Sequence, residues 1–129
     1  MLTVIGIALL CCAAVNPLAA AQKPKPYALI YGTVYGPDDT PVTGVHVRIR
    51  KKDDKKPRYE QYSDRRGEFA QRVPVGPADY IVYADLKSGQ ICRGDKCVDA
   101  KKSGLKPGKE ATVHFDGEER QDISLHLTQ

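Results

Sequence analysis

The chain has 129 residues and a formal net charge of +4, from 20 Lys and Arg against 16 Asp and Glu. This length is enough for one domain. The small positive excess, interspersed with acidic residues, excludes the basic surface of a nucleic-acid-binding protein, and we expect no nucleic-acid partner.

Residues 1–21 have the composition of a signal peptide. Positions 2–15 carry no charge, and residues 19–21 are the small alanines that signal peptidase accepts. The chain departs from the usual pattern in that no Lys or Arg precedes the apolar run. A transmembrane anchor needs roughly 20 apolar residues, more than this run supplies. Leu10 before Cys11 disfavours a lipoprotein. We predict cleavage after Ala21, an exported (periplasmic or secreted) product, and no stable membrane span after cleavage.

The rest divides into a Pro/Lys tether, 22–28, and a domain, 29–129. The tether contains "QKPKP", which favours an extended conformation. Beyond it, apolar residues recur with period two, which indicates half-buried strands. The residues expected to point inward are Ala28, Ile30, Gly32 and Val34; Val45, Val47 and Ile49; Tyr80, Val82 and Ala84; Val113 and Phe115; and Ile123, Leu125 and Leu127.

Turn-forming clusters separate these runs, among them "GPDDTPVTG", "KKDDKKPR", "SDRRGE" and "KSGLKPGKE". Proline and glycine recur about every 8 to 12 residues, and no window sustains a helical stripe. The spacing predicts an all-β fold, an antiparallel β-sandwich of about seven strands.

Part of the chain resembles the carboxypeptidase regulatory-like domain, a transthyretin-like (prealbumin-like) or immunoglobulin-like β-sandwich. The match covers roughly residues 29–86. Its motifs are Gly32-Thr33-Val34, Pro41-Val42-Thr43-Gly44 with Val47, Ser63-Asp64 with Gly67 and Phe69, and Pro74-Val75-Gly76 with Tyr80. The resemblance implies the same sandwich fold, a type of module found mostly in bacterial envelope proteins.

Four matched residues are interpreted as structural turn residues: Gly32, Asp64, Gly67 and Gly76. Asp64 can accept hydrogen bonds from main-chain amides a few residues later, which closes a tight turn. Gly67 can take a positive φ there, and Gly76 permits a bend before the next strand. These are scaffold roles, so Asp64 is not expected to be catalytic.

No catalytic set emerges. Alternation places His46, His114 and His126 on the outward faces of three strands, as scattered surface histidines rather than a zinc site with three or four ligands. No Gly-x-Ser-x-Gly elbow is present. The chain ends in "LHLTQ" and lacks the Tyr-Arg-Gly-Ser ending of the hydroxyisourate hydrolases, and its tyrosines and histidines lack the spacing of an intradiol dioxygenase. We expect no enzyme, no cofactor and no metal.

A cluster of positive charge is expected at a hairpin tip. Its members are Arg48, Arg50, Lys51, Lys52, Lys55, Lys56 and Arg58. Such a tip can meet anionic lipid or a sugar-acid polymer. The alternative is a solvated turn whose lysines protect strand edges from aggregation.

Tyrosines offer a second candidate surface. Tyr31 and Tyr35 fall on one face of the same strand, and Tyr59 or Tyr83 would complete an aromatic platform if either joined them. Flat amphipathic rings stack on sugars, so these tyrosines are candidate glycan-binding residues. Packing under loops is the alternative reading.

Cys92 and Cys97 enclose "RGDK", a spacing that suits a disulfide across a hairpin in an exported chain. Closing so small a loop stabilises by about 2 kcal/mol on the chain-entropy model. Arg93-Gly94-Asp95 can be an adhesion loop for an integrin, or a stapled turn with Gly at its apex. We favour the stapled turn.

The sequence therefore predicts an exported, non-enzymatic β-sandwich module. Its expected role is binding or structural, at the cell envelope or outside the cell. The expected partner is a protein or glycan of the envelope whose identity the sequence does not specify.

Overall fold

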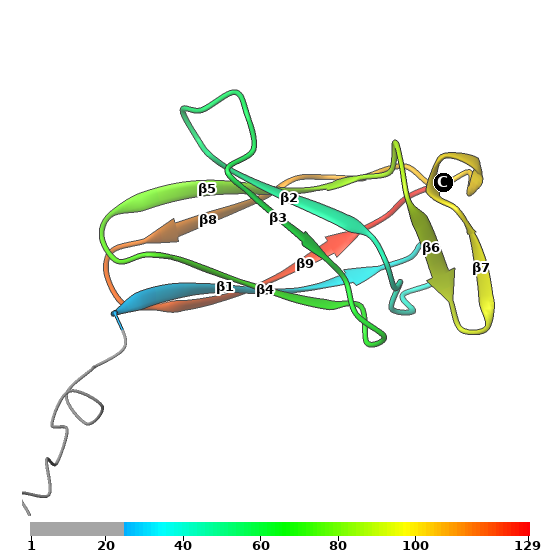
Figure 1. Ribbon diagram of the computed structural model, residues 1–129, viewed down its shortest axis with the longest axis horizontal. Helices are drawn as coiled ribbons and strands as arrows, with labels where there is room; N and C mark the ends of the chain where they lie inside the picture. Colours follow the sequence, from blue (N-terminus) through cyan, green and yellow to red (C-terminus); the bar gives the residue numbers. More distant parts are fainter. Residues whose placement is uncertain (1–24) are drawn as a thin grey trace, which may run out of the picture.

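The computed structural model describes residues 25–129, so the predicted signal peptide and most of the predicted tether lie outside the described residues. Regular structure consists of nine strands and a short 3-10 helix, η2 (Figure 1). Their bounds are β1 Tyr27–Tyr35, β2 His46–Lys51, β3 Tyr59–Tyr62, β4 Glu68–Pro74, β5 Ala78–Asp85, β6 Gln90–Arg93, β7 Lys96–Asp99, η2 Ala100–Lys102, β8 Ala111–Phe115 and β9 Arg120–His126. Strand β1 begins two residues before the predicted domain start at residue 29. Between residues 25 and 129 no helix is both long and apolar enough to cross a membrane.

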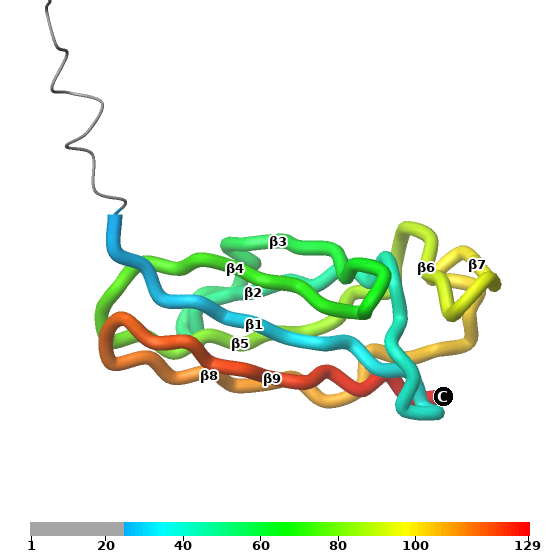
Figure 2. The backbone as a smooth tube through the Cα atoms, turned by 90° about the horizontal axis from the view of Figure 1, so that it is seen from below, coloured from blue at the N-terminus to red at the C-terminus, as the bar shows by residue number. Residues whose placement is uncertain are grey.

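Seven of the strands form two facing sheets. One has the order β4-β1-β9 and the other β3-β2-β5-β8, while β6 and β7 form a separate hairpin. Figures 1 and 2 show the two layers, with the hairpin at the end of the sandwich where the chain terminates. The prediction of an all-β sandwich of about seven strands is confirmed.

One strand pair within the sandwich is parallel. Strand β1 pairs with β4 in the antiparallel sense and with β9 in the parallel sense, from Leu29↔Arg120 to Tyr35↔His126. Parallel neighbours need a long connection between them. Here the connection is the rest of the domain, because β1 and β9 are its first and last strands.

The core lies between the sheets and follows the predicted alternation. Ile30 and Val34 of β1 face Val47 and Ile49 of β2, and all four are fully buried. Tyr80 and Phe115 pack edge to face, with ring centroids 6.0 Å apart. Each large side chain buried in this way stabilises the fold by about 1.5–3 kcal/mol.

Gly32 is not a turn residue, contrary to the sequence-based expectation. It lies inside β1, opposite Phe69 of β4. A Cβ atom at Gly32 would overlap the ring of Phe69. The glycine is therefore required by a close side-chain approach and not by a bend.

The turn between β3 and β4 has the chemistry that its sequence indicates. Asp64 Oδ1 accepts the N–H groups of Arg66 at 2.8 Å and Glu68 at 2.9 Å. Gly67 has φ +74°, and a Cβ there would press on the main chain of β1. Gly76, with φ +128°, lies between β4 and β5.

Candidate functional site

A groove of about 710 Å³ opens beside the second half of β5. Its floor is apolar, with Ala84, Leu86, Ala100 and Leu105 all buried. Polar and aromatic side chains form the walls and rim: Arg48, Tyr83, Asp85, Lys87, Lys101 and Glu110. Concave, mostly apolar sites with a few placed polar groups are where ligands commonly bind.

The groove exists because β8 covers only the first half of β5. Pairing between these strands stops at Val82↔Ala111. The preceding chain turns instead toward the C-terminus, where Lys106 and Thr128 exchange two main-chain hydrogen bonds of 2.7 and 3.0 Å. Gly108 packs so closely on the His126 carbonyl that a Cβ would overlap it. The loop is thereby held away from β5.

Arg48 and Asp85 form the polar wall of the groove. Arg48 Nε lies 2.8 Å from Asp85 Oδ2, with the N–H poorly aligned, so the contact is ionic. The Asp85 side chain is only 11% exposed, and its Oδ1 accepts the Lys87 N–H at 2.9 Å. Arg48 also approaches Glu60 Oε1 at 3.8 Å. Tyr83 is the register partner of Arg48, so the ring and the ion pair are neighbours on one sheet face.

His46 is not a surface histidine, although it points to the outer face of its sheet as expected. It is 6% exposed, because the Tyr62 ring stacks on it at 4.8 Å and 10°. Its Nε2 has no hydrogen-bond partner among residues 25–129, and Glu60 Oε1 lies 3.6 Å away. Alternation predicts which face a side chain takes, but not what covers it there.

The other two histidines lie at separate places. His114, which is exposed, contacts Asp79 at 2.5 Å and Asp116 at 2.9 Å. The hydrogen bond to Asp79, followed by that to Asp116, raises the pKa of His114. His126 stacks on Tyr35. Within the described part of the chain, no three His, Cys, Asp or Glu side chains are grouped as metal ligands.

The four candidate tyrosines do not share a face. Tyr31 and Tyr35 lie on the outer face of the β4-β1-β9 sheet, where Arg120 covers Tyr31 at 4.5 Å and His126 covers Tyr35 at 5.2 Å. Tyr31 donates its hydroxyl hydrogen to Glu68 at 2.5 Å, which raises the pKa of the phenol.

The two remaining candidates belong to the other sheet. Tyr59 turns inward, its ring centroid 6.4 Å from that of Tyr80. Tyr83 lines the groove. The platform that would need Tyr59 or Tyr83 beside Tyr31 and Tyr35 is not formed.

The basic tip is smaller than its sequence indicates. Arg48 and Arg50 lie within β2, and Lys51 ends that strand. Arg50 Nη1 donates to the Lys52 and Asp54 carbonyls at 3.1 Å, and Arg58 pairs with Asp54 at 2.9 Å. These two arginines hold the loop together.

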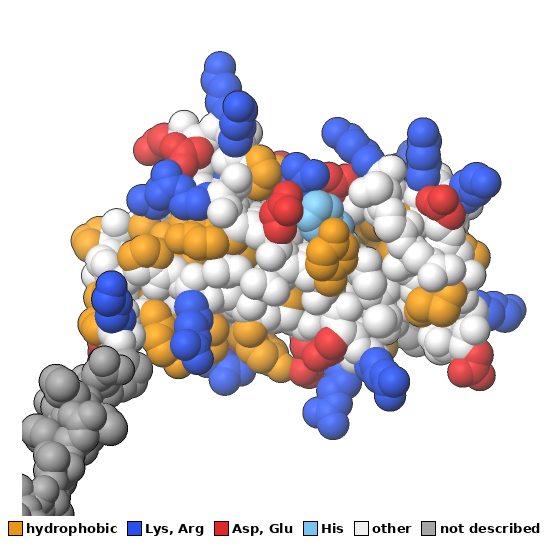
Figure 3. Space-filling view, viewed as in Figure 1, with side chains coloured by type: hydrophobic (Ala, Val, Ile, Leu, Met, Phe, Trp, Pro, Cys, Tyr) orange, Lys and Arg blue, Asp and Glu red, His pale blue; other side chains and the backbone are white. Residues whose placement is uncertain are grey.

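The exposed cations of the tip itself are Lys52, Lys55, Lys56 and Arg58, of which Arg58 is paired with Asp54. Figure 3 shows Lys and Arg side chains standing out from this loop above the sandwich. Arg48 does not belong to the tip, because it lies within β2, where Asp85 of the adjacent strand β5 is its ionic partner.

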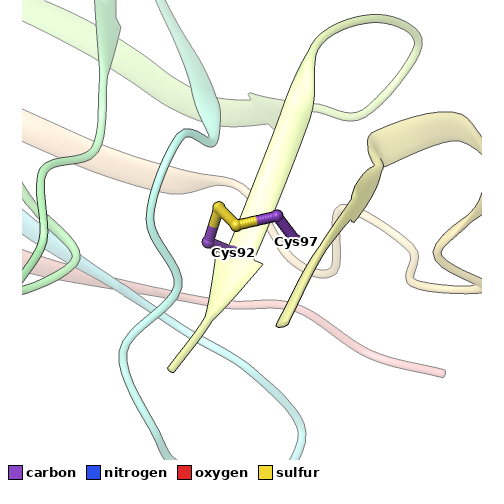
Figure 4. Close-up of a disulfide and its surroundings, with 2 residues drawn as sticks. All are labelled: Cys92 and Cys97. Atoms are coloured by element: carbon purple, nitrogen blue, oxygen red, sulfur yellow. A yellow bond between two sulfur atoms is a disulfide. The ribbon is translucent and has the colours of Figure 1, made fainter. Parts of the chain in front are cut away.

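The β6–β7 hairpin carries the Cys92–Cys97 disulfide (Figure 4). The two Cα atoms are 4.1 Å apart. Thr43 and Cys92 exchange two main-chain hydrogen bonds of 2.9 Å, which attach the hairpin to the sandwich. Arg93 and Lys96 form the last pair, so Gly94, with φ +60°, and Asp95 make a two-residue turn. Such turns favour Gly where φ is positive.

Sequence reasoning found Tyr83 and Arg48 but assigned them to different surfaces. It missed Asp85, Lys87, Lys101 and Glu110. Asp85 follows Tyr83 by two residues on an alternating strand, so its face was predictable. No sequence signal indicated that Lys101 and Glu110 lie across the groove from β5, because only the path of the loop brings them there.

No protein-family model matches the chain, and no curated protein sequence matches it. Among solved structures, a point mutant of the shaft pilin SpaA of Lactobacillus rhamnosus GG is similar, with a TM-score of 0.55 and 12% identity over 80% of this chain and 50% of that one. GBS52, the minor pilin of Streptococcus agalactiae, has a TM-score of 0.54 and 14% identity over 81% of this chain and 45% of that one. The Bacillus anthracis TIE protein has a TM-score of 0.53 and 10% identity over 81% of this chain and 17% of that one. The chain thus spans half or less of these structures, and at such identities the likeness establishes a shared β-sandwich fold.

Proposed function

We propose that the chain is an exported, non-enzymatic β-sandwich module with a binding role at the cell envelope or outside the cell. The observation that carries the export proposal is the Cys92–Cys97 disulfide in an exposed hairpin. Disulfides persist in oxidising compartments and are rare in the cytosol. The uncharged apolar segment at the start of the chain supports the same compartment.

The proposed family is the carboxypeptidase regulatory-like domain. The Asp64 turn, with its hydrogen bonds to Arg66 and Glu68 and the positive φ of Gly67, supports the residue match. The separation of His46, His114 and His126 supports a non-enzymatic role, because a catalytic or metal site needs convergent groups.

Export is tested by purifying the protein from its producing cells and sequencing its N-terminus. The expected product begins at Gln22 and contains no free thiol. A cytosolic product with an intact leader and free Cys92 and Cys97 would contradict the proposal. A variant with both cysteines replaced by serine is the control for the thiol assay.

Glycan binding by the Tyr31 and Tyr35 face is a second candidate function. The two rings lie on one exposed sheet face, each with a planar cationic or aromatic neighbour. If this face binds, the double variant Tyr31→Ala, Tyr35→Ala loses retention on an immobilised polysaccharide that retains the wild type. Retention of that variant at wild-type strength would remove this candidate.

Adhesion through Arg93, Gly94 and Asp95 is a third candidate, supported by their exposure at the tip of the stapled hairpin. It predicts that Asp95→Glu abolishes integrin-dependent cell attachment while leaving the circular dichroism spectrum unchanged. Absence of attachment by the wild type would end it.

A further inference from the structure

The main chain of Ala84 lies at the edge of β5 that borders the groove. Lys52 N donates to Asp79 O at 3.0 Å, which makes these residues a hydrogen-bonded pair in the antiparallel β2–β5 register. Because such pairs alternate, odd-numbered residues of β5 bond to β2 and even-numbered residues face the β8 side. Ala84 is therefore directed to that side.

Strand β8 does not reach this position, since its pairing with β5 ends at Val82. Among residues 25–129, no main-chain hydrogen bond from outside the strands reaches Ala84, and β8 supplies none because its pairing with β5 has already ended. Ala84 is 3% exposed. Nearly all buried main-chain groups in proteins have a partner, so an open donor and acceptor on a groove wall indicate a place for a polar ligand.

The length of the open edge indicates the class of ligand. A peptide that binds to a sheet edge as an extra strand pairs over several residues, and a typical strand has about 5–6 residues. Here β5 ends at Asp85, so Ala84 is the last residue of the strand whose main-chain N–H and C=O point toward the β8 side, and it offers one donor and one acceptor. A compact polyhydroxyl ligand suits this better than an added peptide strand, because each hydroxyl both donates and accepts.

The side chains around Ala84 indicate the charge of the ligand. Tyr83 supplies an aromatic ring beside the Arg48–Asp85 ion pair, whose charges cancel. Of the exposed rim residues, Lys87 and Lys101 are cationic and Glu110 is anionic. The rim therefore has a net positive charge, which favours an anionic ligand.

We propose that the groove beside β5 binds a carboxylate-bearing saccharide, such as a unit of a polyuronate chain. The main chain of Ala84 and the Arg48–Asp85 pair bind its hydroxyl groups, Tyr83 packs on the sugar ring, and Lys87 and Lys101 meet its carboxylate. The inference rests on the proposed binding role of the module, and it concerns a surface separate from the Tyr31 and Tyr35 face.

The test is a titration of the ¹⁵N-labelled exported protein with galacturonic acid tetrasaccharide, followed by two-dimensional NMR. The expected result is saturable binding that shifts the amide signal of Ala84 more than those of the other β5 residues. Raising the salt concentration weakens binding, because the Lys contacts are screened. A neutral galactose tetrasaccharide is expected to bind more weakly.

Matched variants locate the site. Tyr83→Ala is expected to weaken binding about tenfold, and Lys87→Ala with Lys101→Ala to remove the preference for the acidic over the neutral tetrasaccharide. Tyr27→Ala, which removes an exposed ring from the other sheet, leaves binding unchanged.

The outcomes separate this inference from the broader proposal. Loss of binding in Tyr27→Ala but not in Tyr83→Ala would overturn the groove while leaving the glycan-binding role. Equal binding of the two tetrasaccharides would overturn the acidic class. If neither tetrasaccharide moves the Ala84 amide, the site is refuted, whereas export remains subject to its own test.

Discussion

At the scale of single residues, Gly108 sets the course of the loop that opens the groove. Its φ of +72° is a conformation that other residues adopt at a cost of about 1–3 kcal/mol. A side chain there would also overlap the carbonyl of His126. Gly104 has a similar φ of +77° but open space around it. The two glycines therefore separate the cost of backbone conformation from the cost of a clash.

We predict that Gly108→Ala destabilises the protein more than Gly104→Ala does. Gly104→Ala is expected to cost about 1–3 kcal/mol of stability from its φ alone. Gly108→Ala is expected to cost more, because the new side chain must also displace β9 at His126. Urea unfolding followed by circular dichroism measures both free energies. Equal losses would contradict the close approach of Gly108 to His126.

A second residue-scale prediction concerns His114. Asp79 and Asp116 raise its pKa above the ordinary value of about 6.5. Since the pKa is higher in the folded protein than in the unfolded chain, this contribution to stability is complete below the unfolded pKa. It is lost as the pH rises through the folded-state pKa.

The measurement is an NMR titration of the His114 ring. The Asp79 contact is the larger cause, so Asp79→Asn is expected to lower the pKa of His114 more than Asp116→Asn does. The reverse order would show that Asp116 is the stronger partner.

At the scale of elements, the β6–β7 hairpin is held at two places. The Cys92–Cys97 disulfide closes it, and the two hydrogen bonds between Thr43 and Cys92 attach it to the sandwich. Ile91 of β6 is buried, whereas all four residues of β7 are exposed. The inner strand is therefore part of the domain, whereas the outer strand pairs only with β6 and is joined to it by the disulfide as well.

Replacing both cysteines with serine is expected to lower the free energy of unfolding by about 2 kcal/mol, because the closed loop is short. Hydrogen exchange should quicken most in the β6–β7 hairpin, whereas in β2 and β5 it should quicken by no more than the lower global free energy of unfolding accounts for. A larger increase in β2 and β5 than in the hairpin would contradict this local role of the disulfide. The wild-type protein with added reductant is the matched comparison, since it loses the bond without a change of sequence.

At the scale of the whole molecule, the first and last strands complete one sheet together. Strand β1 is central in the β4-β1-β9 sheet, and β9 is one of its two partners. Leu125 and Leu127 also fill the core from this end of the chain. Their burial contributes about 3–6 kcal/mol, a large part of the 5–15 kcal/mol that stabilises a typical domain.

We predict that a chain ending at Glu119 does not fold cooperatively. It lacks a partner strand of β1 as well as Leu125 and Leu127. Thermal unfolding followed by circular dichroism is expected to show no sharp transition. A chain lacking only Gln129, which is exposed, keeps the Lys106–Thr128 pairing and should unfold as the full chain does. A sharp transition in the shorter chain would contradict the structural role of β9.

Several features were determined by the sequence alone. Alternation identified the inward residues of β1, β2, β5 and β8, and Asp64 with Gly67 indicated the turn before β4. These signals are local, since a strand's two faces and a tight turn depend on residues a few positions apart. The spacing of Cys92 and Cys97 is local in the same way.

Other features were decided only by the tertiary structure. The parallel pairing of β1 with β9, the burial of His46 under Tyr62 and the pairing of Arg48 with Asp85 join residues far apart in the chain. The groove arises because β8 stops short of Ala84 and the loop before it bonds to Thr128 instead. Period-two patterning specifies which face of a strand is apolar, but it carries no information about which strand lies beside it or where the pairing ends.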